Sequence, residues 1–385
     1  MLELRLKKDL RKNLLRGHPW LYDGAIECLG PSKKQSEFCR ILDQKKNFLA
    51  YGIYTPKSQL AVRVFSFNKK GNFAELIEER ARTAMSLRAS LIPSDATNAY
   101  RLFNGEGDLL PGLVCDVYGD TAVLQMDGTS LQDFWLQQEG ITKFLSSSFA
   151  SIALKERGKE KGELKWLKSK SKPLLEVKEN HIRFMVDIAA GQKTGMFLDQ
   201  RDNRDYIRSI AKDKSVLNLF SYTGGFSVYA GKGEAKHVTS VDISKGACEF
   251  AEKNWLANEL PKDQHKALAE NVFDILEDDQ HYDMIIADPP SMAQSEKQKA
   301  AAIKKYIDLF SQVAKKVKDN GDMVFSSCSS HISFADFQSI VDESLSKARC
   351  RGQVLRFSGQ GADHPYPHYL PEMRYLKFMH LIKKV

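Results

Sequence analysis

Residues 216–226 read Val-Leu-Asn-Leu-Phe-Ser-Tyr-Thr-Gly-Gly-Phe, an apolar run that enters a glycine-containing turn before a helical pattern. Glycines in such a turn allow the backbone to approach a ligand closely. The next apolar run, 238–242, ends in Asp242, 17 residues beyond Gly225. A carboxylate at that point of an open α/β sheet can accept hydrogen bonds from both hydroxyls of a ribose. The stretch therefore predicts a sheet that binds a nucleoside.

The surrounding sequence alternates between strand and helix patterns after Ile182. We expect strands at 215–220, 237–241, 284–287 and 321–326, and helices at 226–230, 245–258, 300–317 and 334–346. This alternation is typical of a doubly wound, mainly parallel sheet of the α/β class. Ligands of such sheets bind beyond the carboxyl ends of the strands.

The turn lacks the GxGxxG spacing of a dinucleotide site, so a cofactor with one nucleoside and no pyrophosphate fits it better. S-adenosylmethionine is such a cofactor. Asn271, where the third strand should end, can meet the adenine edge or simply cap a short helix. Upstream, Thr194, Gln200 and Arg201 carry groups able to hold the methionine carboxylate. The predicted cofactor contacts are Thr194, Gln200, Phe220, Ser221, Tyr222, Thr223, Gly224, Gly225, Asp242, Ile243, Asn271 and Asp288.

The chemistry is indicated by two later strand ends. Asp288-Pro289-Pro290 forms a rigid extended turn that can hold a flat base, and Cys328 follows Asp288 by 40 positions. A nitrogen with a lone pair attacks a methyl donor directly, whereas carbon 5 of a pyrimidine needs a thiolate added at carbon 6 first. Cys328 and Asp288 are therefore the candidate catalytic residues. The alternative is that Cys328 is a small buried strand residue.

Length and composition argue against several other classes of protein. A chain of 385 residues is expected to hold two or three domains. It has no apolar run of 18 residues and no signal-peptide pattern at its amino terminus, so neither a membrane span nor a membrane partner is expected. Its six cysteines form no CxxC pair, which argues against a metal site and a disulfide scaffold and favours the cytoplasm.

Charge is concentrated at the amino terminus. Residues 1–72 hold 15 Lys or Arg and 6 Asp or Glu, a net +9 in a chain whose total is +8. A second basic stretch, Lys155–Lys172, has eight basic and three acidic residues and is expected to be a mobile hairpin or loop. Local positive charge of this kind indicates binding to a polyanion such as RNA, or merely a solubilising surface.

The first half of the chain is richer in β patterns. Short strands are expected at 38–42, 48–54 and 60–65, a helix at 72–89, further strands at 100–103 and 113–118, and a helix at 131–144. We therefore divide the chain into 1–70, an RNA-binding domain; 71–180, a linker helix and a central β-rich α+β domain; and 181–385, the cofactor-binding domain.

These motifs resemble the RlmI-like family of bacterial methyltransferases that modify carbon 5 of cytosine in 23S ribosomal RNA. Residues 16–20, Arg-Gly-His-Pro-Trp, resemble the PUA domain of that family, a small RNA-binding β-barrel. Residues 101–113 resemble the start of its central domain, and 193–201 and 220–226 match its cofactor motifs. Ser291 stands where many RNA cytosine methyltransferases carry a second cysteine. The resemblance covers nearly the whole chain.

The resemblance implies that Cys328 is the nucleophile, that Thr194, Gln200, Asp242 and Asn271 surround S-adenosylmethionine, and that the carboxyl-terminal domain is a class I methyltransferase with a Rossmann-like sheet. Substrate contacts are expected at Pro289, Pro290, Arg16 and His18. The expected partner is 23S ribosomal RNA, and a homodimer is compatible with the sequence. The rival functions are a nitrogen-directed RNA methyltransferase, for example one acting on guanine, and a non-catalytic RNA-binding ribosome-assembly factor.

Overall fold

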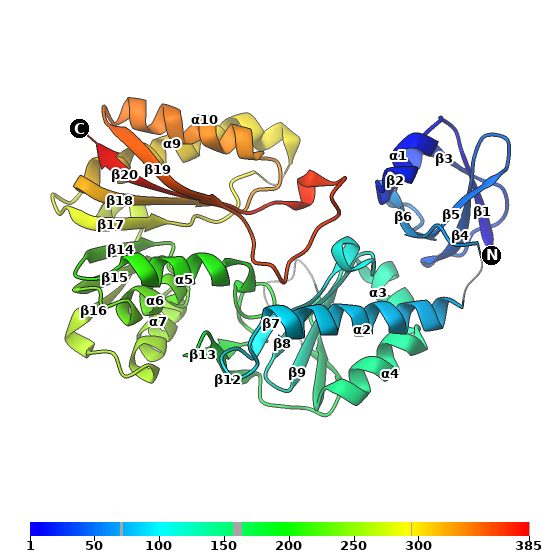
Figure 1. Ribbon diagram of the computed structural model, residues 1–385, viewed down its shortest axis with the longest axis horizontal. Coiled ribbons are helices and arrows are strands. Elements are labelled where there is room, and N and C mark those ends of the chain that lie inside the picture. Colours follow the sequence, from blue (N-terminus) through cyan, green and yellow to red (C-terminus); the bar gives the residue numbers. More distant parts are fainter. Residues whose placement is uncertain (70–71, 157–163, 294, 385) are drawn as a thin grey trace. The chain divides into compact units, whose positions relative to one another are not determined.

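A computed structural model describes residues 1–69, 72–156, 164–293 and 295–384 (Figure 1). The chain folds into two compact units, which we treat separately. The amino-terminal unit comprises Met1–Val177, Val186–Leu198 and Ala362–Pro371. The carboxyl-terminal unit comprises Lys178–Met185, Asp199–Gly361 and Glu372–Val385. The chain therefore passes between the units several times.

The amino-terminal unit begins with a six-stranded sheet of order β2-β6-β5-β4-β1-β3. In β1, buried side chains alternate with partly exposed ones, and Leu4, Ile41 and Val62 are completely buried in the core of the sheet. The strands expected at 38–42, 48–54 and 60–65 are confirmed. The elements are β1 (Leu2–Leu6), α1 (Arg11–Leu15), β2 (Trp20–Tyr22), β3 (Ile26–Cys28), β4 (Glu37–Leu42), β5 (Phe48–Tyr54) and β6 (Leu60–Ser66).

A second sheet in this unit has five strands in the order β11-β10-β9-β8-β7, and a long helix, α2, precedes it. The expected helix at 72–89 is confirmed as α2, which begins after Asn72, whose side chain accepts a hydrogen bond from the amide of Ala74. The elements are α2 (Phe73–Leu91), β7 (Ala99–Asn104), β8 (Leu113–Tyr118), β9 (Thr121–Met126), α3 (Thr129–Leu136), α4 (Glu139–Ser148), β10 (Ser151–Leu154) and β11 (Lys165–Lys168).

The single helix expected at 131–144 is wrong, because the chain breaks into α3 and α4. Gln138 adopts an extended conformation between them. Gly140, in the first turn of α4, packs against α2 so closely that a Cβ there would lie 2.7 Å from the carbonyl oxygen of Ala74. The apolar spacing continues across the break, which is why the sequence pattern does not show it.

The basic stretch 155–172 is described only in part. Residues 157–163, on which the expectation of a mobile hairpin or loop largely rests, lie outside the described residues. Beyond them, β11 pairs antiparallel with β10. A two-stranded ribbon of β12 (Leu174–Glu179) and β13 (Ile182–Asp187) follows.

The carboxyl-terminal unit is built on a seven-stranded sheet of order β16-β15-β14-β17-β18-β20-β19. Strands β14 to β18 run parallel, and β20 runs antiparallel to both of its neighbours. The strands are β14 (Ser215–Leu219), β15 (His237–Asp242), β16 (His265–Ala269), β17 (Tyr282–Ala287), β18 (Val317–Ser327), β19 (Arg351–Ser358) and β20 (Lys377–Lys384). The helices are α5 (Arg201–Ile210), α6 (Gly225–Lys232), α7 (Lys245–Ala257), α8 (Val272–Ile275), α9 (Lys299–Lys316) and α10 (Phe334–Lys347).

The strands of this sheet bury both faces, as expected of a doubly wound fold. On one face, Val216, Met284 and Val324 pack with residues of α5, α6 and α7. On the other, Leu217, Ile285 and Phe325 pack with residues of α9 and α10. Figure 1 shows the two helix layers on opposite sides of the sheet. The α/β class and the strand and helix positions expected after Ile182 are confirmed.

The chain order reverses at β14, since β15 lies on one side of it and β17 on the other. Ligands of doubly wound sheets bind at the carboxyl ends of the strands beside such a reversal. Among the described residues, no helix combines the length and apolar character needed to cross a bilayer. Within the same residues, no group of three His, Cys, Asp or Glu side chains is placed to hold a metal ion.

Candidate cofactor and catalytic site

The turn after β14 is held in an unusual backbone conformation. Phe220, Tyr222 and Gly224 have φ angles of 57°, 47° and 78°. Two of these three residues are not glycine, and left-handed backbone at such residues costs free energy and clusters at functional sites. Gly224 also lies against α7, where a Cβ would come 2.8 Å from the Cβ of Ala251. The turn is thus shaped by close backbone packing.

Asp242, at the end of β15, is hydrogen-bonded to the same turn. Its Oδ2 accepts a hydrogen bond from the amide of Tyr222 at 2.9 Å, and its Oδ1 accepts one from the amide of Ser244 at 2.9 Å. A carboxylate oxygen can accept more than one hydrogen bond, so Asp242 retains acceptor capacity for a ribose. Ile243, the next residue, is 80% exposed, which leaves an apolar surface beside the carboxylate for a flat ring.

The turn also contains a buried polar atom that needs a partner. Ser221 is 6% exposed, and its hydroxyl oxygen makes no hydrogen bond to any described residue. Buried hydroxyls are rarely left unpaired, so this atom points to a ligand or an ordered water. Together with Asp242 and Ile243, it fits a cofactor that combines a polar chain, a ribose and a purine.

Asp288 directly follows β17 at the same edge of the sheet, since β14 and β17 are parallel neighbours. Gln200 Nε2 donates to Asp288 Oδ2 at 2.9 Å. Gln200 is itself oriented by Asn203, whose Nδ2 donates to Gln200 Oε1 at 2.7 Å. The carboxylate orientation is therefore fixed by two amide side chains. Pro289 is buried and Pro290 is exposed, so the second proline faces solvent.

Cys328 follows β18, the parallel neighbour of β17, and its side chain is half-buried. Its neighbours Ser327 and Ser329 are completely buried. The hydroxyl groups of both serines lie 3.0 Å from the Tyr306 hydroxyl on α9. Because the serines are anchored inward on either side, the thiol between them is more accessible than either serine.

The loops after β17 and β18 are joined by one contact between hydroxyl groups. Ser291 Oγ lies 3.0 Å from Ser329 Oγ and donates to the carbonyl oxygen of Ala293 at 3.2 Å. The Asp288-Pro-Pro turn and the cysteine turn are thus positioned relative to each other. This places a carboxylate, a proline surface and a thiol at one edge of the sheet.

Asn271 acts as a helix cap, which was one of the two expectations for it. Its Oδ1 accepts a hydrogen bond from the amide of Phe273 at 3.0 Å, at the start of α8. The oxygen has a second lone pair, so a contact with the adenine edge stays a prediction.

Four other predicted residues, three of them in the amino-terminal unit, keep their roles as predictions. Thr194 belongs to the amino-terminal unit, where it is completely buried and its hydroxyl donates to Asp116 at 2.5 Å. Arg16 is exposed at the end of α1, and His18 Nδ1 accepts a hydrogen bond from the amide of Trp20 at 3.3 Å. Arg201 is 5% exposed and lies beside Asp202.

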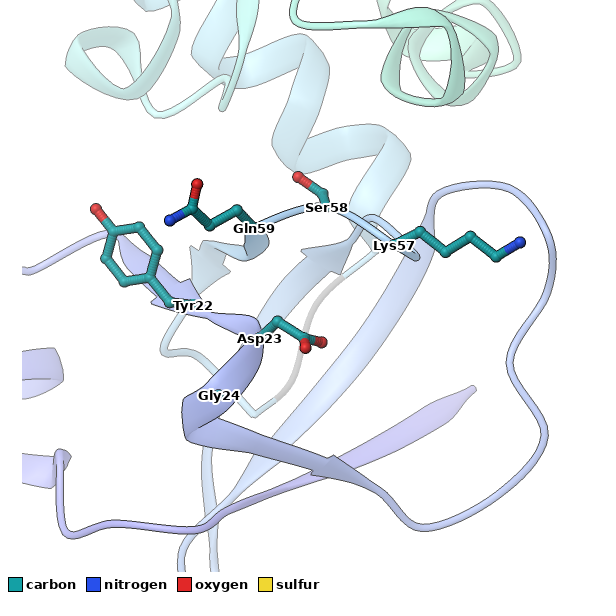
Figure 2. A pocket seen from close by; sticks show the side chains of 6 residues that line it. All are labelled: Tyr22, Asp23, Gly24, Lys57, Ser58 and Gln59. Carbon is teal, nitrogen blue, oxygen red and sulfur yellow. The ribbon is translucent and has the colours of Figure 1, made fainter. Parts of the chain in front are cut away.

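A hollow of about 510 Å³ lies in the six-stranded domain, lined by Tyr22, Asp23, Gly24, Lys57, Ser58 and Gln59. Figure 2 shows that Lys57 extends away from Tyr22 and Gln59, so the polar groups do not converge on one point. We assign no chemistry to this hollow.

Two residues near the thiol were missed by the sequence reasoning. Tyr306 lies inside an ordinary amphipathic helix pattern, which carries no signal of a polar role. Lys377 is a lysine within the apolar strand β20 and is completely buried. A lysine in an otherwise apolar strand could have marked this position as unusual in the sequence, since lysine is almost never fully buried without a reason.

Comparison with known proteins agrees with this geometry. Residues 130–329 match the family of S-adenosylmethionine-dependent methyltransferases, and residues 4–67 match a PUA-like domain. The chain is 35% identical to ribosomal RNA large subunit methyltransferase I of Tolumonas auensis over 97% of each chain. It is 34% identical to the protein of the same name from Photobacterium profundum, again over 97% of each chain.

Solved structures share the fold. A Streptococcus mutans protein described as a SAM-dependent methyltransferase superposes with a TM-score of 0.87 at 24% identity, covering 99% of this chain and 100% of that one. A methyltransferase crystallised with SAH superposes with a TM-score of 0.88 at 24% identity and the same coverage. The chain belongs to the family of S-adenosylmethionine-dependent methyltransferases that includes the ribosomal RNA large subunit methyltransferases I.

Proposed function

We propose that this enzyme methylates carbon 5 of a cytosine in large-subunit, 23S, ribosomal RNA through a covalent adduct with Cys328. The observation that carries the proposal is the placement of Cys328. It is an accessible thiol, held between two buried serines, at the sheet edge that also carries Asp288 and the glycine turn. A nitrogen-directed methyltransferase needs no thiol there.

The residues at this edge would act in sequence. The Cys328 thiolate forms a bond to carbon 6, and the electron pair of the ring double bond moves to make carbon 5 nucleophilic. Asp288, oriented by Gln200, accepts a hydrogen bond from the N4 amine of the base and so holds the ring in position. The glycine turn, Asp242 and Ser221 would hold S-adenosylmethionine, which would supply the methyl group to carbon 5 and leave as S-adenosylhomocysteine. A base then removes the proton of carbon 5, and that electron pair restores the double bond and expels the thiolate.

The test is a methylation assay with tritiated S-adenosylmethionine and unmodified 23S ribosomal RNA, followed by digestion to nucleosides. Wild type is expected to yield radioactive 5-methylcytidine, and Cys328→Ala none, although both should bind the cofactor in calorimetry. Cys350→Ala is the matched control, since Cys350 is also half-buried but lies just before β19. A methylated purine, or full activity of Cys328→Ala, would reassign the enzyme to the nitrogen-directed class.

Binding of the RNA backbone is proposed for the amino-terminal sheet, because the net charge of +9 lies in residues 1–72. Some of the basic side chains are already paired with acidic ones, as Arg5 is with Glu27 and Arg40 with Glu3. Lys7, Lys8 and Lys12 are exposed around α1. They are therefore better candidates for phosphate contacts.

Replacing Lys7, Lys8 and Lys12 with alanine is expected to weaken RNA binding and to reduce the salt slope of log K by about 0.7–0.9 per lost phosphate contact. Fluorescence anisotropy across a salt series measures both quantities. The control replaces three exposed lysines of the other unit, Lys297, Lys304 and Lys305. Equal losses in the two variants would show that general charge, and not this surface, drives binding.

A further inference from the structure

Lys377 is a buried cation with an unusual set of partners. It is 0% exposed, at the first position of β20, and is followed by Phe378 and Met379, both buried. In the described part of the chain, the acceptors recorded for its Nζ are two backbone carbonyl oxygens, Ser329 O at 2.6 Å and Tyr375 O at 2.7 Å. Buried lysines are normally paired with a carboxylate, so neutral carbonyl partners leave the positive charge uncompensated.

The position of Lys377 ties it to the cysteine turn. In the antiparallel pairing of β18 with β20, Lys377 is the register partner of Ser327. Its ammonium group then bonds the carbonyl of Ser329. The side chain therefore contacts the residue after Cys328 while its backbone lies opposite the residue before it. No other lysine of β20 is placed in this way, since Lys383 and Lys384 reach Val317 and Asn320 at the opposite end of β18.

A purely structural role explains this lysine poorly. The Ser329 carbonyl already accepts a hydrogen bond from the amide of Ile332 at 3.1 Å, so it does not need the ammonium group to avoid being unpaired. Burial lowers the pKa of Lys377 to about 8, while the nearby Cys328 and Asp336 act in the opposite direction. At pH 7 the protonated form of such a group still outnumbers the neutral form by about ten to one. The fold thus keeps a desolvated positive charge next to the thiol.

We infer that Lys377 is the positioning residue that stabilises the thiolate form of Cys328. This inference rests on the proposed function, in which the thiolate attacks carbon 6 and is later expelled. A cation beside a thiol favours its ionised form and makes it a better leaving group. Lys377 keeps its proton throughout and exchanges none with the substrate. Tyr306 and Asp336 are titratable groups near Lys377 and the thiol, and the Asp336 carboxylate is paired with Lys299 at 2.8 Å.

The test measures thiolate formation without any methylation. Wild type, Lys377→Met and Lys377→Arg are alkylated with iodoacetamide across a pH series, and the modification of Cys328 is followed by peptide mass spectrometry. Cys350, which is also half-buried, serves as the reference thiol in every sample. In Lys377→Met the midpoint pH for Cys328 is expected to rise by about 1–3 units, and in Lys377→Arg by less, because one unit-charge partner shifts a titration by this amount. Lys384→Met, on the same strand, should leave the midpoint of Cys328 unchanged, since Lys384 reaches Asn320.

The outcomes separate the inference from the proposed function. An unchanged Cys328 midpoint in folded Lys377→Met would overturn the inference and make Lys377 a packing residue. Should that variant not fold, a wild-type midpoint for Cys328 at or above that of Cys350 would overturn it equally. A shifted midpoint in an enzyme that makes no 5-methylcytidine would uphold the coupling of Lys377 to Cys328 and reject the proposed function instead.

Discussion

The turns after β14 and β18 lie at the same edge of one sheet but are built by different means. The cofactor turn is shaped by its backbone, with left-handed residues at Phe220, Tyr222 and Gly224 and close packing against α7. The cysteine turn is shaped by buried side chains that hydrogen-bond its serines. Adding a side-chain atom should disturb the cofactor turn, whereas removing a hydrogen-bonding atom should disturb the cysteine turn. Substitutions should therefore separate cofactor binding from chemistry.

Adding a methyl group to the cofactor turn is expected to have the larger effect. In Gly224→Ala the new Cβ would lie 2.8 Å from Ala251 Cβ, on a backbone with φ of 78°. Left-handed backbone costs a non-glycine residue about 1–2 kcal/mol, and the contact adds to this. We expect the affinity for S-adenosylhomocysteine to fall about 10- to 100-fold, as measured by calorimetry.

The adjacent glycine supplies the control. In Gly225→Ala the nearest neighbour of the new Cβ would be the Arg204 side chain, at 3.1 Å, and no positive φ is involved. Its affinity for the cofactor is expected to stay within a few-fold of wild type. If both variants bind equally well, the backbone of this turn does not shape the cofactor site, and the contrast between the two turns is lost.

The contrast explains which parts of the site the sequence revealed. Glycines, prolines and strand-end acids carry local signals, so Gly224, Asp242 and the Asp288-Pro-Pro turn could be found from pattern and spacing alone. The four strands and four helices expected after Ile182 were likewise predictable, because the central strands are apolar on both faces, whereas no residue ranges were predicted for β16, β19, β20, α5 and α8. Family resemblance supplied the reaction and the role of Cys328.

The remaining features depend on contacts between distant residues. Tyr306 comes from the middle of α9 and Lys377 from the last strand, and only the pairing of β18 with β20 brings the lysine to the cysteine turn. The break between α3 and α4 was not predicted for the same reason, since it follows from the packing of Gly140 on α2. Thr194 belongs to a motif that was recognised in the sequence, but the sequence did not show that its hydroxyl group bonds Asp116 within the amino-terminal unit.

Removing one atom from the cysteine turn is expected to have a smaller effect, and one of a different kind. Tyr306→Phe deletes a hydroxyl group that lies 3.0 Å from both Ser327 Oγ and Ser329 Oγ. Leaving two buried serine hydroxyls with fewer partners should lower the free energy of unfolding by about 1–2 kcal/mol. Because these serines hold Cys328 in place, methyl transfer and alkylation of the thiol should also slow, while affinity for S-adenosylhomocysteine should match that of wild type.

Tyr206→Phe is the matched control, since its hydroxyl bonds His380 Nδ1 at 2.8 Å on the same sheet, away from the cysteine turn. It should lower stability by a similar amount in urea titrations and leave the alkylation rate of Cys328 unchanged. The comparison fails if Tyr306→Phe slows alkylation no more than Tyr206→Phe does, because stability loss alone would then account for both. A loss of cofactor affinity in Tyr306→Phe would show instead that the two turns are mechanically coupled across the edge of the sheet. The two turns would then still differ in how they are held in place, but they would not act independently in cofactor binding and chemistry.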